Sequence, residues 1–394
     1  MPNTRRTMTL LAIGATVAAG AVALGTNGAS AATIPADQIG YAAMSGGTTG
    51  GAGGPTVTVT TWDQLKTEAG KKTAEIIKVS GMLQGSGQIT VRNDKTIVGV
   101  GANSGITGGG LKISHYNNLI VRNMKISYPT GTDAITVQDA DHVWIDHNEL
   151  WSDRSHDIDY YDGLIDITHA ADWVTVSWNK LHDHWKTSLV GHDDDNAAED
   201  TGHLTVTYHH NEFYNDDARL PSLRFGTAHV YNNYYHDTVN AVHSRMGAQV
   251  LVEGNVFTNV GTPVKTTTLS VTDGFAVERN NRYTNCGANN ITQVIIGKSR
   301  RTRWFELLHG SVVDALVRAV NTFANRGVDY LTVFAFSSEN WKRPSEEVSG
   351  LMGLVLVAVS KYLTKLAGDG VRVRIVGDRS KGSNKLRDAW EYAE

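Results

Sequence analysis

The sequence predicts an all-β protein built as a right-handed parallel β-helix, followed by a partial α/β fragment. A pattern of alternating apolar residues ending in Asn recurs through the middle of the chain, and helical periodicity begins only near Lys298. The charge balance changes at the same place, since residues 33–297 hold 18 basic and 29 acidic side chains and residues 298–394 hold 16 and 11. A mildly acidic chain of 394 residues with a net charge of −4 also argues against a nucleic acid as the general partner.

Residues 1–32 are expected to be a secretory signal peptide, so the protein is expected to be secreted and extracellular. Arg5 and Arg6 precede an apolar stretch of about 15 residues, and small residues at 29–31 supply a cleavage site. A membrane anchor is the alternative, but the stretch is shorter than the roughly 20 residues that span a bilayer. The paired arginines leave the general and twin-arginine export routes both open. Cys286 is the single cysteine, so stability must come from the core, from bound ions or from both.

The repeated segments place Val, Ile, Thr and Tyr at alternate positions and end in Asn, as in VWIDHNEL, VTVSWNKL and VLVEGNVF. Strands that recur once per coil in one direction stack as parallel sheets. Asn suits the tight turn after each strand, because it tolerates left-handed backbone angles and its amide can bond the same group in the next coil. An antiparallel sandwich, with turns every 8–12 residues or so, is the alternative. The period of 22 to 32 residues is measured between Asn123, Asn148, Asn179, Asn211, Asn233, Asn255 and Asn281.

Residues at matching positions in successive coils lie about 4.8 Å apart, so a site can be assembled from distant parts of the sequence. Asp146 lies two residues before Asn148, and Asp162 and Asp166 are four apart, an even offset that points both to one face of an extended segment. Three carboxylates without an adjacent Arg or Lys suit Ca²⁺, which prefers oxygen ligands. Alternatively, each is a surface turn aspartate. The acidic residues 192–195 are interpreted as a solvated loop.

Cationic side chains follow at a common position of the repeat. Lys186 comes seven residues after one ladder asparagine and Arg219 eight residues after the next, so both are expected on neighbouring strands. Arg224 lies five residues beyond Arg219, and Pro221 restricts the backbone between them. Surface cations are common, but the shared position next to a carboxylate-lined coil favours a site.

Several of these segments carry a family resemblance. VWIDHNEL, YDGLIDIT, VSWNKLHDHWKTSLVG and YHHNEFYNDDARLPSLRFG resemble the signature segments of extracellular pectate lyases of the parallel β-helix type. The similarity runs over residues 33–293 and includes several separate motifs in order. The resemblance implies that Asp146, Asp162 and Asp166 hold Ca²⁺. It implies that Arg219 is the base, that Lys186 assists catalysis, and that Lys186 and Arg224 bind substrate carboxylates.

The implied reaction is β-elimination in polygalacturonate (pectate), a polyanionic polysaccharide. Removal of the C5 proton beside the carboxylate expels the O4 leaving group and gives unsaturated oligogalacturonates. Ca²⁺ and Lys186 would stabilise the extra negative charge that develops. A guanidinium normally stays protonated, so an arginine base predicts activity that rises into alkaline pH. A pectin lyase acting on the methyl ester without Ca²⁺, or a non-catalytic polysaccharide-binding β-helix, are the alternatives. We expect a monomer that has no membrane contact after signal cleavage.

The last hundred residues resemble a different family. LTVFAFSSENWKRPSEEVSGLM and VRVRIVGD are similar to segments of cis-prenyltransferases that make undecaprenyl diphosphate. No D-G-N-G-R-W segment precedes His309 and no R-T-G-G segment follows Asp378, so the resemblance implies a fragment without transferase activity. We therefore expect a β-helix domain over 33–297 that lacks its usual C-terminal cap, a junction over 298–308 and a partial fragment over 309–394. Alternatively, residues 309–394 are a genuine second domain of a natural two-domain protein.

Overall fold

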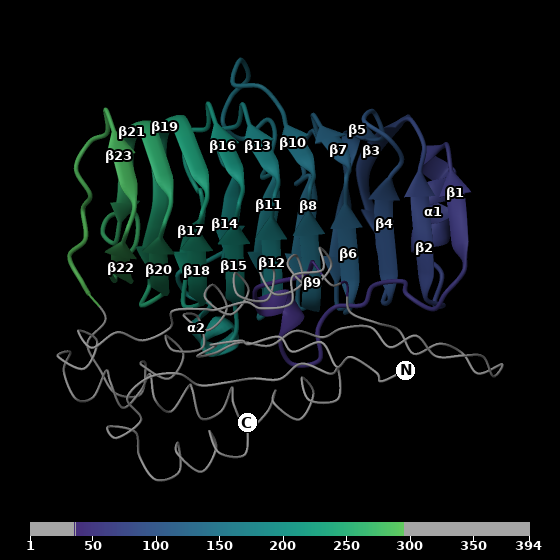
Figure 1. Cartoon of the computed structure of the whole chain (residues 1–394), viewed down its shortest axis with the longest axis horizontal. Coiled ribbons are helices and arrows are strands. Elements are labelled where there is room, and N and C mark those ends of the chain that lie inside the picture. The colour runs from purple at the N-terminus through teal and green to yellow at the C-terminus, as the bar shows by residue number, and fades with distance from the viewer. Residues whose placement is uncertain (1–34, 36, 295–394) are drawn as a thin grey trace, which may run out of the picture. The chain divides into compact units, whose positions relative to one another are not determined.

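The computed structural model describes residue 35 and residues 37–294, which form the parallel β-helix that the sequence predicts (Figure 1). Within these residues, every pairing between two named strands is parallel, which excludes an antiparallel sandwich. No helix of the described residues is long and apolar enough to cross a membrane. The expected signal peptide, junction and C-terminal fragment lie outside the described residues.

A ten-stranded sheet forms one side of the β-helix, with one strand from each coil. In spatial order its strands are β1 (Thr56–Val59), β2 (Glu75–Val79), β4 (Lys95–Gly99), β6 (Leu119–Arg122), β9 (Asp141–Asp146), β12 (Asp172–Ser177), β15 (Thr205–His209), β18 (Thr227–Tyr231), β20 (Gln249–Glu253) and β22 (Phe275–Arg279).

A thirteen-stranded sheet supplies the rest of each coil, because its long strands β5, β19 and β21 join two rows of shorter strands. Its strands are β3 (Met82–Thr90), β5 (Gly105–Ser114), β7 (Lys125–Ser127), β8 (Ile135–Gln138), β10 (Glu149–Trp151), β11 (Ile165–Thr168), β13 (Lys180–His182), β14 (Ser188–Val190), β16 (Glu212–Tyr214), β17 (Ser222–Arg224), β19 (Tyr234–Arg245), β21 (Val256–Lys265) and β23 (Arg282–Thr284).

The core is a set of side-chain stacks that run through successive coils. Alternate residues of each strand point inward, so partners in register, such as Ile145 of β9 and Val176 of β12, pack directly on one another. Burying each such side chain stabilises the fold by about 1.5–3 kcal/mol. One stack is aromatic, since the rings of Phe213 and Tyr235 are 4.8 Å apart and those of Tyr235 and Phe257 4.7 Å apart.

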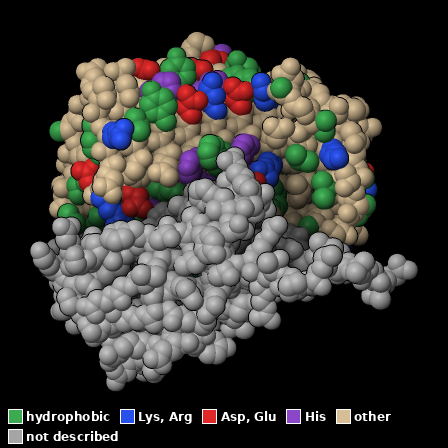
Figure 2. Space-filling model, viewed as in Figure 1, with side chains coloured by type: hydrophobic (Ala, Val, Ile, Leu, Met, Phe, Trp, Pro, Cys, Tyr) green, Lys and Arg blue, Asp and Glu red, His purple; other side chains and the backbone are tan. Residues whose placement is uncertain are grey.

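Charged side chains alternate in sign on the outer face of the first row of short strands. Lys125, Glu149, Lys180 and Glu212 occupy the same position in four successive coils. Figure 2 shows such an alternating row of basic and acidic side chains across the coils. Lys125 Nζ lies 3.1 Å from the Glu149 carboxylate, so neighbouring coils carry opposite rather than like charges at this position.

The predicted asparagine ladder is confirmed for six of the seven residues. From Asn148 to Asn281, each side-chain amide donates to the next asparagine at 2.9–3.1 Å. Asn123 is one residue out of register, because Met124 occupies the ladder position. The Met124 backbone N–H donates to Asn148 Oδ1 in the next coil.

The left-handed backbone angle lies one residue earlier than expected. The residues before the ladder asparagines adopt positive φ, including His147 (55°), Trp178 (54°) and Asn232 (54°), and so does Asn123 (54°). The ladder asparagines are therefore held by their buried amide bonds, and the turn is made by the preceding residue.

One end of the β-helix is covered by helix α1 (Trp62–Ala69), which packs on β2 and β3 through the buried Leu65 and Ala69. Thr61 begins the helix by accepting a hydrogen bond from the Gln64 N–H. A four-residue helix α2 (Ala197–Asp200) follows β14.

Residues 37–55, here called the N-terminal strap, run across the outer face of the ten-stranded sheet (Figure 1). The strap contains a short 3-10 helix, η1 (Tyr41–Ala43), whose backbone N–H groups donate to Thr207 and Thr175. Further along, the Thr49 N–H donates to Asn118 Oδ1 at 2.7 Å. These hydrogen bonds attach the strap to successive coils of the sheet.

Candidate active site

The three predicted cations lie in neighbouring coils of the thirteen-stranded sheet. Lys186, just before β14, forms a parallel bridge with Ala218, and Arg219 follows Ala218 directly. Arg224 ends β17, and Arg219 adopts a φ of +66° two residues before the cis Pro221. The expected placement of Lys186 and Arg219 on neighbouring coils is confirmed.

Asp162 and Asp166 lie beside these cations. In β11, Ile165 and Ile167 point to the core, so Asp166 between them points outward. Arg219 Nη1 lies 4.0 Å from the Asp166 carboxylate. Lys186 Nζ lies 3.3 Å from Asp162 Oδ1 and 2.7 Å from Asp159 Oδ1.

Asp133 is a third carboxylate at this position, and the sequence analysis missed it. Its Oδ1 lies 2.9 Å, and Asp166 Oδ1 2.6 Å, from the point where a Cβ atom on Gly163 would be, so the two carboxylates face one small space. Asp133 is fixed there because it accepts hydrogen bonds from the Gly163 N–H at 2.8 Å and from Thr136 Oγ1 at 2.6 Å. The register of β8 with β11 could have identified Asp133, because Asp133 lies two residues before Ile135, and Gly163 lies two residues before its partner Ile165.

The carboxylates repel one another. Burial raises the pKa of Asp166 well above its usual range, and the charge of Asp133 raises it further. Burial also raises the pKa of Asp133, with a further upward contribution from Asp162. Arg219 offsets only part of this effect. Ionising both carboxylates side by side is therefore unfavourable unless a further cation is supplied.

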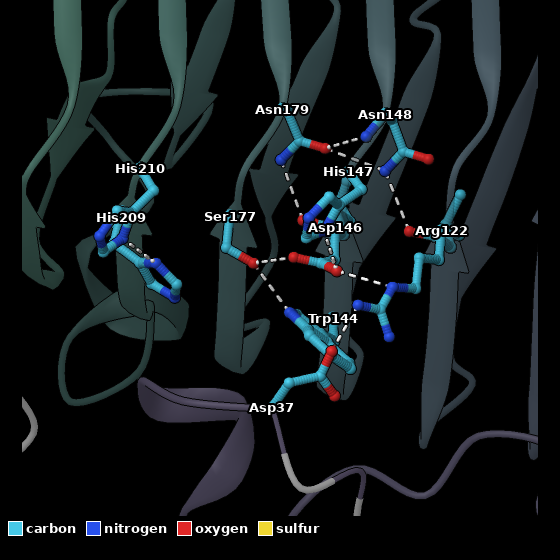
Figure 3. Close-up of polar contacts among 12 residues, drawn as sticks. Asp37, Arg122, Trp144, Asp146, His147, Asn148, Ser177, Asn179, His209 and His210 are labelled. Atoms are coloured by element: carbon cyan, nitrogen blue, oxygen red, sulfur yellow. Dashed lines mark hydrogen bonds and ion pairs between the residues drawn. The ribbon is translucent and has the colours of Figure 1, made fainter. Parts of the chain in front are cut away.

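Asp146 does not belong to this cluster, which corrects the predicted metal-ligand set. It ends β9 in the ten-stranded sheet, whereas Asp166 lies in β11 of the thirteen-stranded sheet. Figure 3 shows the Asp146 carboxylate between Arg122 and Ser177, with Nε of Arg122 at 2.9 Å and Oγ of Ser177 at 2.6 Å. His147 Nδ1 lies 2.6 Å away, so both carboxylate oxygens already have partners.

The grouping of Asp146 with Asp162 and Asp166 fails because a turn separates Asp146 from Asp162. Strand phase is preserved within one strand, but β9 ends at Asp146, and the chain then passes through β10 before it reaches β11. Asp146 points to the outer face of its own sheet, where the N-terminal strap covers it.

Asp133, Asp162 and Asp166 fit a hard cation such as Ca²⁺ by their chemistry, because all three supply carboxylate oxygens. Within residues 37–294, no three acidic, histidine or cysteine side chains are already drawn together tightly enough to hold a metal ion. The fit therefore rests on the facing oxygens of Asp133 and Asp166, on the cost of ionising them side by side without a further cation, and on the proximity of Asp162.

His184 accepts a hydrogen bond from the backbone of Lys186 and was not predicted from the sequence. It is 1% exposed, and its Nδ1 accepts the Lys186 backbone N–H at 2.9 Å. Burial lowers the pKa of His184 to about 4, and the neighbouring Lys186 lowers it too. The ring is therefore neutral near pH 7, with its proton on Nε2.

Arg224 is held by the loop that was interpreted as solvated. Its Nε donates to Asp194 Oδ1 at 2.5 Å, and its Nη1 donates to the Gly191 carbonyl at 2.7 Å. Asp193 and Asp195 are exposed as expected, so the interpretation of residues 192–195 is wrong only for Asp194.

Comparison with known proteins identifies the family. The sequence model of the pectate lyase family matches residues 9–306, and that of the undecaprenyl diphosphate synthase family matches residues 299–394. Pectate lyase A from Aspergillus niger is 42% identical over 299 residues, which cover 70% of this chain and 91% of the relative. Pectate lyase A from Emericella nidulans is 43% identical over 255 residues, covering 64% and 77%.

A solved structure agrees. The crystal structure of a pectate lyase from Bacillus sp. N165 in complex with trigalacturonate is 34% identical, with a TM-score of 0.60, and covers 71% of this chain and 99% of that one. The parallel β-helix, the order of its motifs and these relatives agree, and the chain belongs to the pectate lyase family of polysaccharide lyases.

Proposed function

We propose that the protein is a secreted, Ca²⁺-dependent pectate lyase that cleaves 1,4-linked polygalacturonate by β-elimination and releases unsaturated oligogalacturonates. The observation that supports this most strongly is the meeting of Asp133, Asp162 and Asp166 with Lys186 and Arg219 from four successive coils. Cations beside a group of facing carboxylates suit a polyanion that binds through a divalent cation.

Each side chain has a distinct part in the proposed reaction. Arg219 removes the proton from C5, the electron pair forms the C4–C5 double bond, and O4 leaves with the departing chain. Lys186 pairs with the uronate carboxylate and stabilises the negative charge that develops as the proton is removed. Arg224 binds a second substrate carboxylate. Asp133, Asp162 and Asp166 would hold Ca²⁺, which supplies additional positive charge for the substrate carboxylate when it is bound.

Substrate must displace an internal contact before Lys186 can act. Lys186 Nζ is bonded to Asp159, which is exposed, and to Asp162. Binding of a cation by Asp162 would remove one of these partners, and a substrate carboxylate would replace the other. This sequence of exchanges couples the cation site to the substrate site.

The test is product absorbance on polygalacturonate with and without a chelator. We expect unsaturated products that absorb in the ultraviolet, loss of activity with chelator and recovery with Ca²⁺. Chelator-resistant activity that prefers the methyl ester would indicate a pectin lyase, and binding without product would indicate a non-catalytic protein. Maximal activity near pH 5, rather than in the alkaline range expected for an arginine base, would contradict the role of Arg219.

We also propose that residues 1–32 are removed on export, that the mature protein is monomeric and that residues 309–394 contribute no prenyl transfer. The basis is the charged and apolar pattern before residue 32 and the absence of a D-G-N-G-R-W segment before His309. Mass spectrometry of protein collected from the medium would identify the mature N-terminus. Size-exclusion chromatography and an assay with allylic diphosphates would test the other two proposals.

A further inference from the structure

We propose that Asp194 and Ser270 are positioning residues that hold the Arg224 guanidinium in the orientation in which it receives a carboxylate of the polyuronate. This inference rests on the proposed function, because it takes Arg224 as a substrate-binding residue. The two positioning residues come from different coils, since Asp194 follows β14 and Ser270 lies between β21 and β22. Together they are called the Asp194–Ser270 clasp below.

Hydrogen bonds to the clasp fix the orientation of the guanidinium. Asp194 Oδ1 accepts from Arg224 Nε at 2.5 Å and from Ser270 Oγ at 2.9 Å. The Gly191 carbonyl accepts from Arg224 Nη1 at 2.7 Å. Arg224 Nη2 has no hydrogen-bond partner within the described part of the chain, so two of the three nitrogens are held and the third can meet a substrate carboxylate.

The backbone of the first loop is shaped for this close approach. Gly191 adopts a φ of +79°, which favours glycine. A Cβ atom at Gly191 would lie 3.0 Å from Arg224 Cβ and 3.1 Å from the Arg224 carbonyl oxygen. A larger residue would therefore push the loop, and Asp194 with it, away from Arg224.

The negative charge of Asp194 also acts on a second arginine, Arg245. Arg245 lies in register with Arg224 in the next coil and is 6% exposed. Burial lowers the pKa of Arg245 to about 10, Arg224 lowers it further, and Asp194 opposes the effect. Asp194 thus offsets the repulsion between two neighbouring arginines that would otherwise turn Arg224 away.

The second loop contacts both arginines. Ser270 bonds to Asp194, and the carbonyl of the preceding Leu269 accepts from Arg245 Nη1 at 3.0 Å. Burial raises the pKa of Asp194, but the hydrogen bonds from Arg224 and Ser270 lower it. The net effect is a lowered pKa. The clasp carboxylate is therefore ionised wherever the enzyme would work.

The experiment compares KM and kcat for polygalacturonate in the full chain. Asp194→Asn keeps the shape but removes the charge, so we expect KM to rise about tenfold while kcat stays within about twofold. Ser270→Ala removes one neutral hydrogen bond and is expected to raise KM about threefold. Asp195→Asn is the matched control, because it removes the same charge from an exposed neighbour, and its KM should stay near that of the wild type.

A double variant separates positioning from a general structural effect. If Asp194 acts through Arg224, then Asp194→Asn combined with Arg224→Ala raises KM no more than Arg224→Ala alone. Misfolding would instead lower the active fraction and kcat with KM unchanged. A KM for Asp194→Asn equal to that of Asp195→Asn, or additive effects in the double variant, would overturn the clasp. An inactive wild type would refute the proposed function itself, and an unchanged KM in Arg224→Ala would refute both the substrate-binding role and the clasp.

Discussion

Asp146 and Asp166 are both buried, both lie at outward positions of a parallel sheet, and burial raises the pKa of both. They differ in their partners. Asp146 is surrounded by Arg122, His147 and Ser177, all of which favour its ionised form. Asp166 faces Asp133, whose charge disfavours the ionised form of Asp166. Arg219 Nη1 lies 4.0 Å from the Asp166 carboxylate.

The difference distinguishes a structural carboxylate from a functional one. A buried charge whose partners are supplied by the protein holds elements together, and here it links β6, β9 and β12 beneath the N-terminal strap. A buried charge next to like charges costs stability and persists where a ligand supplies the missing cation. Substitutions in the two clusters should therefore have different effects on activity and on stability.

The largest effect is expected for the two arginines. Arg219→Lys keeps the positive charge but removes the guanidine proposed to take the C5 proton, so we expect kcat on polygalacturonate to fall about a thousandfold. Arg122→Lys is the same exchange beside Asp146 and should leave kcat within about twofold. Product absorbance measures both. Equal losses in the two variants would contradict the assignment of Arg219 as the base.

The aspartates themselves should separate activity from stability. Asp166→Asn is expected to lower activity about a hundredfold, because a cation ligand is lost. It should not destabilise the calcium-free protein, since it removes a repelled carboxylate. Asp146→Asn should retain activity but lower the free energy of unfolding by about 1–3 kcal/mol, because hydrogen bonds to a charged group are lost. Activity assays and urea unfolding without Ca²⁺ would check the pair, and the reverse pattern would restore Asp146 as a ligand.

The carboxylate cluster also predicts how stability depends on pH. Folding raises the pKa of Asp133 and Asp166, so their contribution is present below the unfolded pKa near 3.8 and is lost as pH rises through the folded pKa. We therefore expect the contribution of these two aspartates to the free energy of unfolding of the calcium-free protein to fall as pH rises from about 4 to 8. Stabilisation by added Ca²⁺ should grow over the same range, because the cation binds the ionised carboxylates.

Asp166→Asn tests this interpretation of the pH dependence. Asp146 and Asp216 also have raised pKa values and add a slope of the same sign, whereas His184, with its lowered pKa, adds one of the opposite sign; all three are present in both proteins. The difference between wild type and variant therefore isolates Asp166, and the variant should show a shallower slope. An identical slope would mean that the cluster does not control the pH dependence.

The sequence was sufficient for features that repeat locally along the chain. The strands, the stacking and the six ladder asparagines follow from period and alternation. Lys186 and Arg219 were correctly placed in neighbouring coils because they follow successive ladder asparagines by seven and eight residues, although Lys186 pairs with Ala218 and so lies one residue out of register with Arg219. Asn123 was assigned to the ladder because one residue of register cannot be seen without the pairing partner.

Contacts between coils were harder to predict. Asp133 and Asp166 lie in adjacent coils, so a full coil of sequence separates them along the chain. The residues around Asp133, GTDA, contain no distinctive motif. Asp194 meets Ser270 across 76 positions of sequence through loops of different coils, so neither residue is marked by periodicity. Strand phase cannot carry such information across turns of varying length, which is also why Asp146 was grouped with the wrong carboxylates.

The smallest effect is expected at the edge of the Asp146 cluster. Asp37 in the strap pairs with Arg122, but its side chain is 57% exposed, so water screens the attraction and the pair should contribute no more than about 0.5 kcal/mol. Asp37→Asn should therefore lower the free energy of unfolding by less than this amount, measured by urea unfolding, with activity unchanged. Asp146 remains bonded to Arg122 in that variant, so the buried half of the network survives. A loss as large as that of Asp146→Asn would show that the ionic contact of the strap, and not the buried hydrogen bonds, holds this side of the β-helix together.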